Sequence, residues 1–204
     1  MTTHLIEFVR AETPIAQPVT KLGGQPVWLE EPQWPVAGSG EPMMFIAQIA
    51  LDTLGFPGRV AYLFMDDSED ADETWDYDAG SNAVIVQPDG ELLVPVEVRP
   101  LHQGPTLQAY VPVAGERMLQ PQPREFAVTL REVSEEVPEG VFETKIGGTP
   151  AWLQGDETPG EGWLLLLQLD SNTELFSINF GDVGVGYAFL RPDGRAGKFG
   201  WQCT

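Results

Sequence analysis

Cysteine and histidine are nearly missing from this chain of 204 residues, which has one cysteine and two histidines. The single thiol, Cys203, excludes an intramolecular disulfide. Nucleophilic catalysis relies most often on a histidine base, and neither His4 nor His102 lies in a recognisable nucleophile motif. Zinc sites need three or four ligands at defined spacing, and the sequence has no such cluster. These absences favour a non-enzymatic protein with no metal or cofactor.

Basic residues are also scarce, because 11 Lys and Arg stand against 31 Asp and Glu and give a net charge of −20. A polyanion releases no counterions from a phosphate backbone, so nucleic acid is disfavoured as a partner. An anionic membrane surface is disfavoured by the same repulsion. The charge favours a basic protein or peptide as the partner, through electrostatic steering as well as contact. Acidity that serves only solubility is the alternative.

Long apolar segments are missing as well. The longest uninterrupted run, residues 163–167, is too short to span a bilayer. Residues 1–10 lack the cationic start and apolar stretch of a secretory signal. Together with the single cysteine, these features predict a location in the reducing cytoplasm.

Glycine and proline, by contrast, are abundant, with 22 and 18 residues. They interrupt helices and favour turns, and the apolar residues between them alternate or form short runs. We therefore predict a β-rich α+β fold with short connecting helices only. Residues 91–98 are expected to form an edge strand, because Pro95 cannot donate to a ladder. The other expected strands are 43–51, 59–65, 82–87, 126–130, 162–169, 175–180 and 185–190.

The two halves of the chain share a motif. Residues 20–29 (TKLGGQPVWL) recur as residues 144–153 (TKIGGTPAWL), with seven of the ten positions identical. Shorter matches follow in the same order, 46–49 with 166–169 and 60–64 with 185–189. We therefore predict two pseudo-repeated antiparallel β units packed into one compact body. The first unit is expected to span 1–90 and the second, shorter unit 142–204, with connecting strands in 91–141.

The shared motif carries the candidate binding residues. The chain has three lysines, and two of them occupy equivalent positions of the motif. The Gly-Gly pairs permit positive φ or close backbone approach, and each tryptophan offers a large surface with one N–H donor. Either each motif is a bend with a core tryptophan, or the two motifs meet and line a groove for a peptide. The residues of this hypothetical site are Lys21, Gly23, Gly24, Trp28, Lys145, Gly147, Gly148 and Trp152.

Carboxylates are concentrated between Asp66 and Asp78, where eight occur. Hard cations such as Ca²⁺ accept such oxygens, but Ala71 stands where an EF-hand needs glycine for its sharp turn. Like charges repel, so we expect an exposed, solvated loop, with a weak cation site as the alternative. No pair of carboxylates is singled out, although a catalytic pair of the glycosidase kind remains an open alternative.

The motif resembles a known family. The order K-[LI]-G-G-x-P-x-W-L, then a strand with an A-Q-I-type triplet (residues 47–49), then a Y-x-F strand (residues 62–64), is similar to the bacterial YwqG-like proteins. The same signature resembles the start of the programmed-cell-death-2 and Tsr-type ribosome-maturation proteins, which are grouped with them. The resemblance covers residues 20–87 well and 144–201 more loosely. It implies an uncharacterised bacterial protein, or a chaperone-like one that holds a basic protein. The cysteine-rich part of the eukaryotic members is absent here.

These observations lead to one functional expectation and one alternative. We expect a cytosolic, non-enzymatic protein- or peptide-binding module for a basic partner, of the immunity-protein or dedicated-chaperone type. The alternative is a small hydrolase that uses a carboxylate pair.

Overall fold

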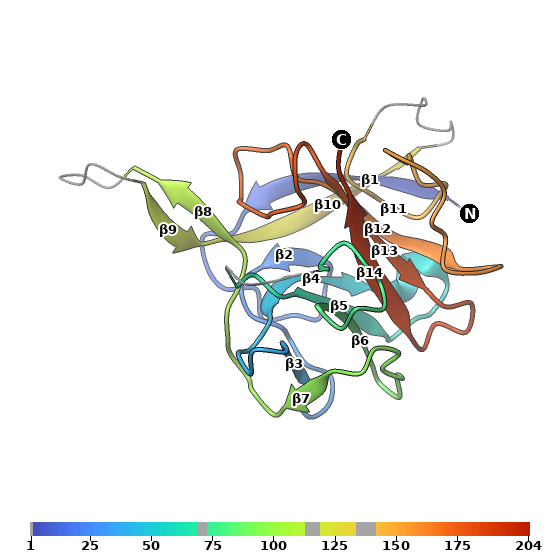
Figure 1. Cartoon of the computed structure of the whole chain (residues 1–204), viewed down its shortest axis with the longest axis horizontal. Helices are drawn as coiled ribbons and strands as arrows, with labels where there is room; N and C mark the ends of the chain where they lie inside the picture. The colour runs from blue at the N-terminus through green and yellow to red at the C-terminus, as the bar shows by residue number, and fades with distance from the viewer. Residues whose placement is uncertain (1, 69–72, 113–118, 134–141) are drawn as a thin grey trace.

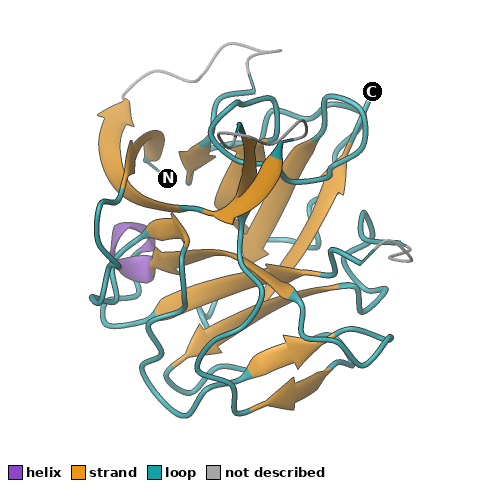
Figure 2. Cartoon of the chain, turned by 90° about the vertical axis from the view of Figure 1, so that its left-hand side faces the viewer, coloured by secondary structure: helices purple, strands orange, loops and turns teal. Residues whose placement is uncertain are grey.

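A computed structural model describes residues 2–68, 73–112, 119–133 and 142–204, which form one strongly curved sheet with two small accessory sheets (Figures 1 and 2). Across these ranges the structure has strands and a single short 3₁₀ helix, η1 (Leu51–Leu54), and no α-helix. The predicted α+β class is therefore wrong, and the fold is all-β. The strands are β1 (Thr3–Arg10), β2 (Lys21–Gly23), β3 (Trp34–Val36), β4 (Met44–Ala50), β5 (Val60–Met65), β6 (Asn82–Gln87), β7 (Glu97–Arg99), β8 (Gln108–Val111), β9 (Gln120–Pro123), β10 (Glu125–Val133), β11 (Lys145–Ile146), β12 (Leu164–Asp170), β13 (Val185–Leu190) and β14 (Gly197–Gln202).

The main sheet has ten strands in the order β14-β13-β12-β11-β1-β10-β2-β4-β5-β6, and all neighbours are antiparallel. At its centre, β1 pairs with β10 along eight residues, from Thr3 opposite Val133 to Arg10 opposite Phe126. The first strand of the chain also pairs with β11, and β10 pairs with β2. Strands from both halves of the sequence thus alternate in the middle. The prediction of two pseudo-repeated antiparallel β units packed into one body is wrong, because strands from both halves of the chain interleave in one continuous sheet.

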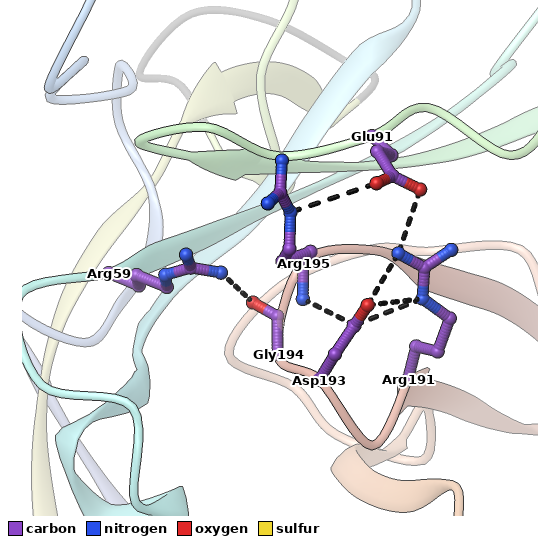
Figure 3. Close-up of polar contacts among 6 residues, drawn as sticks. All are labelled: Arg59, Glu91, Arg191, Asp193, Gly194 and Arg195. Atoms are coloured by element: carbon purple, nitrogen blue, oxygen red, sulfur yellow. Dashed lines mark hydrogen bonds and ion pairs between the residues drawn. The ribbon is translucent and has the colours of Figure 1, made fainter.

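The edge strands of the sheet, β6 and β14, approach each other. The side-chain amide of Asn82 on β6 donates to the carbonyl of Phe199 on β14 at 3.0 Å. The turn between β13 and β14 also meets the segment after β6, where Arg191 donates to Glu91 at 2.8 Å and to Asp193 at 2.7 Å (Figure 3). Arg195 contributes a backbone carbonyl that accepts from the Glu91 N–H at 2.7 Å. Side-chain and backbone bonds therefore hold the two ends of the sheet together.

Both faces of the sheet are buried over much of its area, which explains why β4, β5, β6 and β13 read as continuous apolar runs. The inner face forms one large cluster that includes Leu22, Ile46, Ile146 and Phe180. Two smaller clusters lie on the outer face. One packs Trp34 and partly buried Trp28 on β4, β5 and β6, and the other packs Trp152 and Trp163 on β12 and β13. Because successive side chains of a strand point to opposite faces, the same strands supply both layers.

The strands β8 and β9 form a separate hairpin that stands away from the main body (Figure 1). The other accessory sheet pairs β3 with β7, so residues 91–98 do not form the long edge strand that alternation suggested. No helix in the described ranges is long and apolar enough to cross a membrane.

Candidate functional site

The first motif is fixed by a polar row that crosses three strands. Lys21 on β2, Gln48 on β4 and Tyr62 on β5 are direct cross-strand partners. The Lys21 ammonium donates to the Gln25 carbonyl at 2.7 Å, and the Tyr62 hydroxyl donates to the Val27 carbonyl at 2.7 Å. The Gln48 side chain accepts from the Val27 N–H at 2.9 Å. The row therefore satisfies the backbone groups of the loop that follows Gly-Gly, which is why this polar triad is buried at no loss of hydrogen bonds.

The second motif makes the same contacts. Lys145, Gln168 and Tyr187 are direct cross-strand partners on β11, β12 and β13. The Lys145 ammonium donates to the Thr149 carbonyl at 2.7 Å, and Tyr187 donates to the Ala151 carbonyl at 2.7 Å. The tryptophans also correspond, since Trp28 lies 4.6 Å from the Tyr62 ring and Trp152 lies 4.6 Å from the Tyr187 ring.

Both motifs require glycine, because the backbone at these positions has a positive φ and other atoms occupy the place of a Cβ. Gly24 has φ +68° and Gly148 has φ +71°. A Cβ on Gly24 would collide with the carboxyl group of Glu125, and one on Gly148 would collide with the hydroxyl of Thr3. Each motif thus packs against a strand that comes from the other half of the chain.

The two lysines differ in their electrostatic partners. Lys21, which is 1% exposed, forms an ion pair with Glu125 at 2.6 Å. Its ammonium also donates to the Ile15 carbonyl, so all three N–H groups have acceptors. Lys145 is equally buried, and no carboxylate in the described ranges pairs with it. Burial therefore lowers the pKa of Lys145, and the negative charge of Glu143 offsets part of this effect.

The predicted meeting of the two motifs is not seen in the sheet order. β2 and β11 are separated by β1 and β10, and the two tryptophans belong to different apolar clusters. Lys21 and Gly24 line an open cleft, whereas Lys145, Gly147, Gly148 and Trp152 do not. Gly23 and Trp28 also lie outside the lining of that cleft.

The cleft beside the first motif has a volume of about 610 Å³. Its walls are largely apolar, and the ion pair between Lys21 and Glu125 makes its charged part neutral. Gln25 braces one wall, because its amide both donates to and accepts from the backbone of Gly104 at 3.0 Å. The lining residues are Pro14, Ile15, Ala16, Lys21, Gly24, Gln25, Pro26, Val27, Gln103, Gly104, Pro105, Thr106, Gln108, Pro123 and Glu125.

One polar group in this cleft has no partner. Thr106 is 6% exposed, and its buried hydroxyl makes no hydrogen bond to any described residue. A buried hydroxyl without a partner costs about 1–3 kcal/mol. The hydroxyl has almost no accessible surface, so a ligand in the cleft does not reach it without a rearrangement of the wall.

A second cavity, of about 360 Å³, lies along β1 and contains acidic side chains. Glu7, Glu143 and Asp170 are among its lining residues, and Arg131 lies 3.9 Å from the Glu7 carboxylate. Glu7 and Arg131 are each more than half exposed. Solvent screens the charges in so open a site. Acid–base catalysis by carboxylates favours enclosed sites, where charges interact strongly, so this cavity is a poor candidate for it.

The acidic loop is described only in part, because residues 69–72 lie outside the described ranges. The remainder is tied to β14, since Lys198 pairs with Asp78 at 2.6 Å and the Trp201 indole donates to the Thr74 hydroxyl at 3.1 Å. Asp67 and Asp78 are exposed, and Asp66 and Asp76 are half-buried. Within the described ranges, no group of three or more His, Cys, Asp or Glu is placed to hold a metal ion.

Sequence reasoning did not find Glu125 or Thr106. Both lie in residues 91–141, the segment without a motif. Glu125 directly precedes the alternating apolar residues Phe126 and Val128, and this position at the start of a strand was the only local signal. The contact between Glu125 and Lys21 joins two strands that are far apart in the chain, so no local spacing of residues predicts this contact.

The chain is a small all-β protein with a curved ten-stranded sheet. An open cleft with apolar walls lies beside a motif whose lysine is buried. Residues 20–198 match the model of a family described as a domain of unknown function, DUF1963. The chain belongs to this family. A search of curated proteins found no match.

Proposed function

We propose that this protein is a non-enzymatic binding module that holds a peptide segment of a basic partner protein in the cleft beside Lys21. The observation that carries the proposal is the cleft itself, with its volume of about 610 Å³ and its mostly apolar walls. Ligand sites commonly combine such walls with a few polar groups, and here the lining includes Gln103 and Gln108.

Charge supports a basic partner. The cleft has no net charge of its own, because Glu125 neutralises Lys21, while the whole chain carries −20. A basic protein is therefore attracted over long range to a cleft whose own ion pair is neutral. The resemblance to YwqG-like proteins, and through them to chaperones that hold a basic protein, agrees with this proposal. The single cysteine agrees with a cytoplasmic location.

A hydrolase is the less supported function. Its carboxylate pair would have to come from the cavity with Glu7, Glu143 and Asp170, where Glu7 is well exposed. Catalytic carboxylates work best where one is desolvated and the other stays ionised. We therefore favour binding over hydrolysis.

The test is a capture experiment with a variant that fills the cleft. Ala16 is exposed and lines the cleft, so Ala16→Trp blocks it without touching the core. The matched control is Thr53→Trp on η1, an exposed position away from the cleft. The tagged full chain and both variants are incubated with host lysate at low and high salt, and any recovered protein is purified and titrated.

We expect wild type and Thr53→Trp to retain a basic protein that Ala16→Trp loses. Its binding weakens at high salt, because the Debye length falls from about 10 Å at 0.1 M to about 3 Å at 1 M. A partner that binds Ala16→Trp equally well, or one that is acidic, contradicts the proposal, as does the recovery of no partner.

A further inference from the structure

A smaller cavity that contains two arginines adjoins the cleft. Its volume is about 220 Å³, and Arg10 and Arg124 are among its lining residues. A chain that lies in the cleft can extend into this cavity, because the two share part of their walls. The shared lining residues are Pro14, Gly24, Pro123 and Glu125.

The pairing of β1 with β10 brings the two arginines to the same end of the sheet. Arg10 is the last residue of β1 and lies opposite Phe126. Arg124 directly precedes β10, two residues before Phe126. Arg10 is exposed, whereas Arg124 is only 7% exposed. Two of the 11 basic residues of an acidic chain therefore lie at one cavity.

Neither arginine has an acidic partner among the described residues, where no ion pair joins Arg10 or Arg124 to a carboxylate. The side chain of Arg124 donates one hydrogen bond, from Nη1 to the Pro123 carbonyl at 3.3 Å. Its other nitrogen atoms have no described acceptor and, unlike the Thr106 hydroxyl, they are not sealed from solvent. Burial lowers the pKa of Arg124, and the nearby charge of Arg10 lowers it further. The buried guanidinium thus lacks a counter-charge, which an anion would supply.

Two carboxylates belong to the lining of the same cavity, Glu12 and Glu125. Glu125 is already paired with Lys21 at 2.6 Å, and the same oxygen accepts from the Ile15 N–H. Glu12 is exposed and forms no ion pair with a described residue. Among the lining residues, Glu12 is therefore the carboxylate that competes with an incoming anion.

We propose that Arg10 and Arg124 bind the C-terminal carboxylate of the peptide segment that occupies the cleft. This inference rests on the proposed function and specifies which part of the partner enters the site. A guanidinium group suits a carboxylate, because its N–H groups match the two oxygens and the hydrogen bonds are charge-assisted. A basic segment has few acidic side chains, but a free chain end always has a carboxylate, and such ends are a common means of peptide recognition.

The probe is a heptapeptide of alternating alanine and lysine that begins and ends in alanine, with fluorescein on its N-terminus. It is titrated by anisotropy against the full chain, once as the free acid and once as the C-terminal amide. We expect the free acid to bind about tenfold more tightly, because only the acid makes charge-assisted hydrogen bonds to the arginines. A third peptide, amidated and with glutamate as its last residue, should bind like the amide. If it binds like the free acid, the site accepts any carboxylate and the assignment to the chain end is overturned.

The preference for acid over amide, measured within each variant, isolates the role of the arginines. Arg124→Gln should abolish the preference, and Arg10→Gln should reduce it at least threefold. Arg10 is exposed, so its substitution keeps the test valid even if Arg124→Gln fails to fold. Arg131→Gln is the matched control, because it removes the same charge from an exposed arginine of β10 that lies beside Glu7. The control should keep the preference, and an equal reduction in Arg131→Gln and Arg10→Gln would mean unspecific attraction and overturn the inference.

Glu12→Gln should have the opposite effect. The substitution removes the competing carboxylate, so the free acid should bind more tightly while binding of the amide stays the same. Weaker binding of the acid in Glu12→Gln would contradict the assignment, as would equal binding of acid and amide to the wild type, or no binding of either.

Capture from lysate separates this inference from the proposed function. If Ala16→Trp loses the partner while Arg10→Gln and Arg124→Gln retain it, the proposed function stands and the carboxylate site falls. If the arginine variants also lose the partner and Arg131→Gln retains it, both are supported.

Discussion

Lys21 and Glu125 form an ion pair of 2.6 Å between β2 and β10, although 104 residues separate them in the chain. Glu125 also accepts a hydrogen bond from the Ile15 N–H at 3.2 Å. One carboxylate thus connects the first lysine motif, the loop before it and a strand from the other half of the sequence. The ion pair is nearly buried at both ends, which makes its loss expensive.

We expect Glu125→Gln to lower the free energy of unfolding by about 3 kcal/mol, because it leaves the Lys21 charge buried without compensation. Urea denaturation of both proteins measures the difference. Glu7→Gln is the control, since the pair of Glu7 with Arg131 is long and exposed and should contribute less than about 0.5 kcal/mol. Equal losses in the two variants would show that the Lys21 pair has no special role.

Lys145→Met should behave differently from Lys21→Met. Lys21→Met leaves Glu125 without its cation and is expected to destabilise the fold, whereas Lys145→Met removes a buried charge that no described carboxylate pairs with. We expect Lys145→Met to be neutral or stabilising at pH 7. Thermal melts of the two variants under identical conditions provide the comparison, and a larger loss for Lys145→Met would contradict it.

The stability of the wild type should rise with pH because of Lys145. Burial lowers the pKa of this lysine in the folded state, while the unfolded chain keeps its proton up to about pH 10.4. Between the two pKa values the unfolded state binds more protons, so the free energy of unfolding increases with pH. Denaturant titrations from pH 7 to pH 10 should show this increase in wild type and its absence in Lys145→Met. An identical slope in both proteins would exclude Lys145 as the source.

Gly24→Ala should cost about 1–3 kcal/mol, because the new methyl group meets the Glu125 carboxyl group and the backbone has φ +68°. Gly38→Ala is the matched control, since a Cβ there meets nothing within 4 Å and its φ is not positive. The control should change the free energy of unfolding by less than about 0.5 kcal/mol. Equal effects would mean that the close approach in the motif is unimportant.

The turn between β13 and β14, which contacts the other end of the sheet, should weaken in acid. The hydrogen bonds from Arg191 lower the pKa of Asp193, so its contribution to stability is present at neutral pH and is lost as the pH falls through the folded-state pKa (Figure 3). Because Asp193 is nearly half exposed, this contribution should be below about 1 kcal/mol. Asp193→Asn should therefore lose less stability than wild type between pH 7 and pH 3. A steeper loss in the variant would contradict this assignment.

Sequence patterns predicted the buried strands well. The runs expected at 43–51, 59–65, 82–87 and 185–190 correspond to β4, β5, β6 and β13, because burial on both faces produces continuous apolar stretches. β1 and β14 were not predicted, since β1 carries polar residues between its apolar ones and β14 contains Gly197 and Gly200. Residues 175–180 alternate as a strand would, but they form only an isolated bridge at Ser177.

The sequence predicts only those residues of the site that lie close to one another along the chain. The lysine, glycines and tryptophan of each motif lie within eight residues of each other, so their pattern shows in the sequence. The partners of the first motif come from β10 and from residues 104–108, and such distant contacts depend on the sheet order. Nothing in the spacing of the motifs revealed that β1 and β10 separate them.

The central position of β1 has a consequence for the order in which the chain is synthesised. β1 leaves the ribosome before the other strands of this sheet, yet both of its neighbours, β10 and β11, belong to the second half of the sequence. It must therefore wait with unpaired backbone groups until Val133 and Ile146 have also emerged. During that interval the nascent chain exposes a strand that carries Leu5, Ile6, Phe8 and Val9, the kind of apolar segment that co-translational chaperones cover.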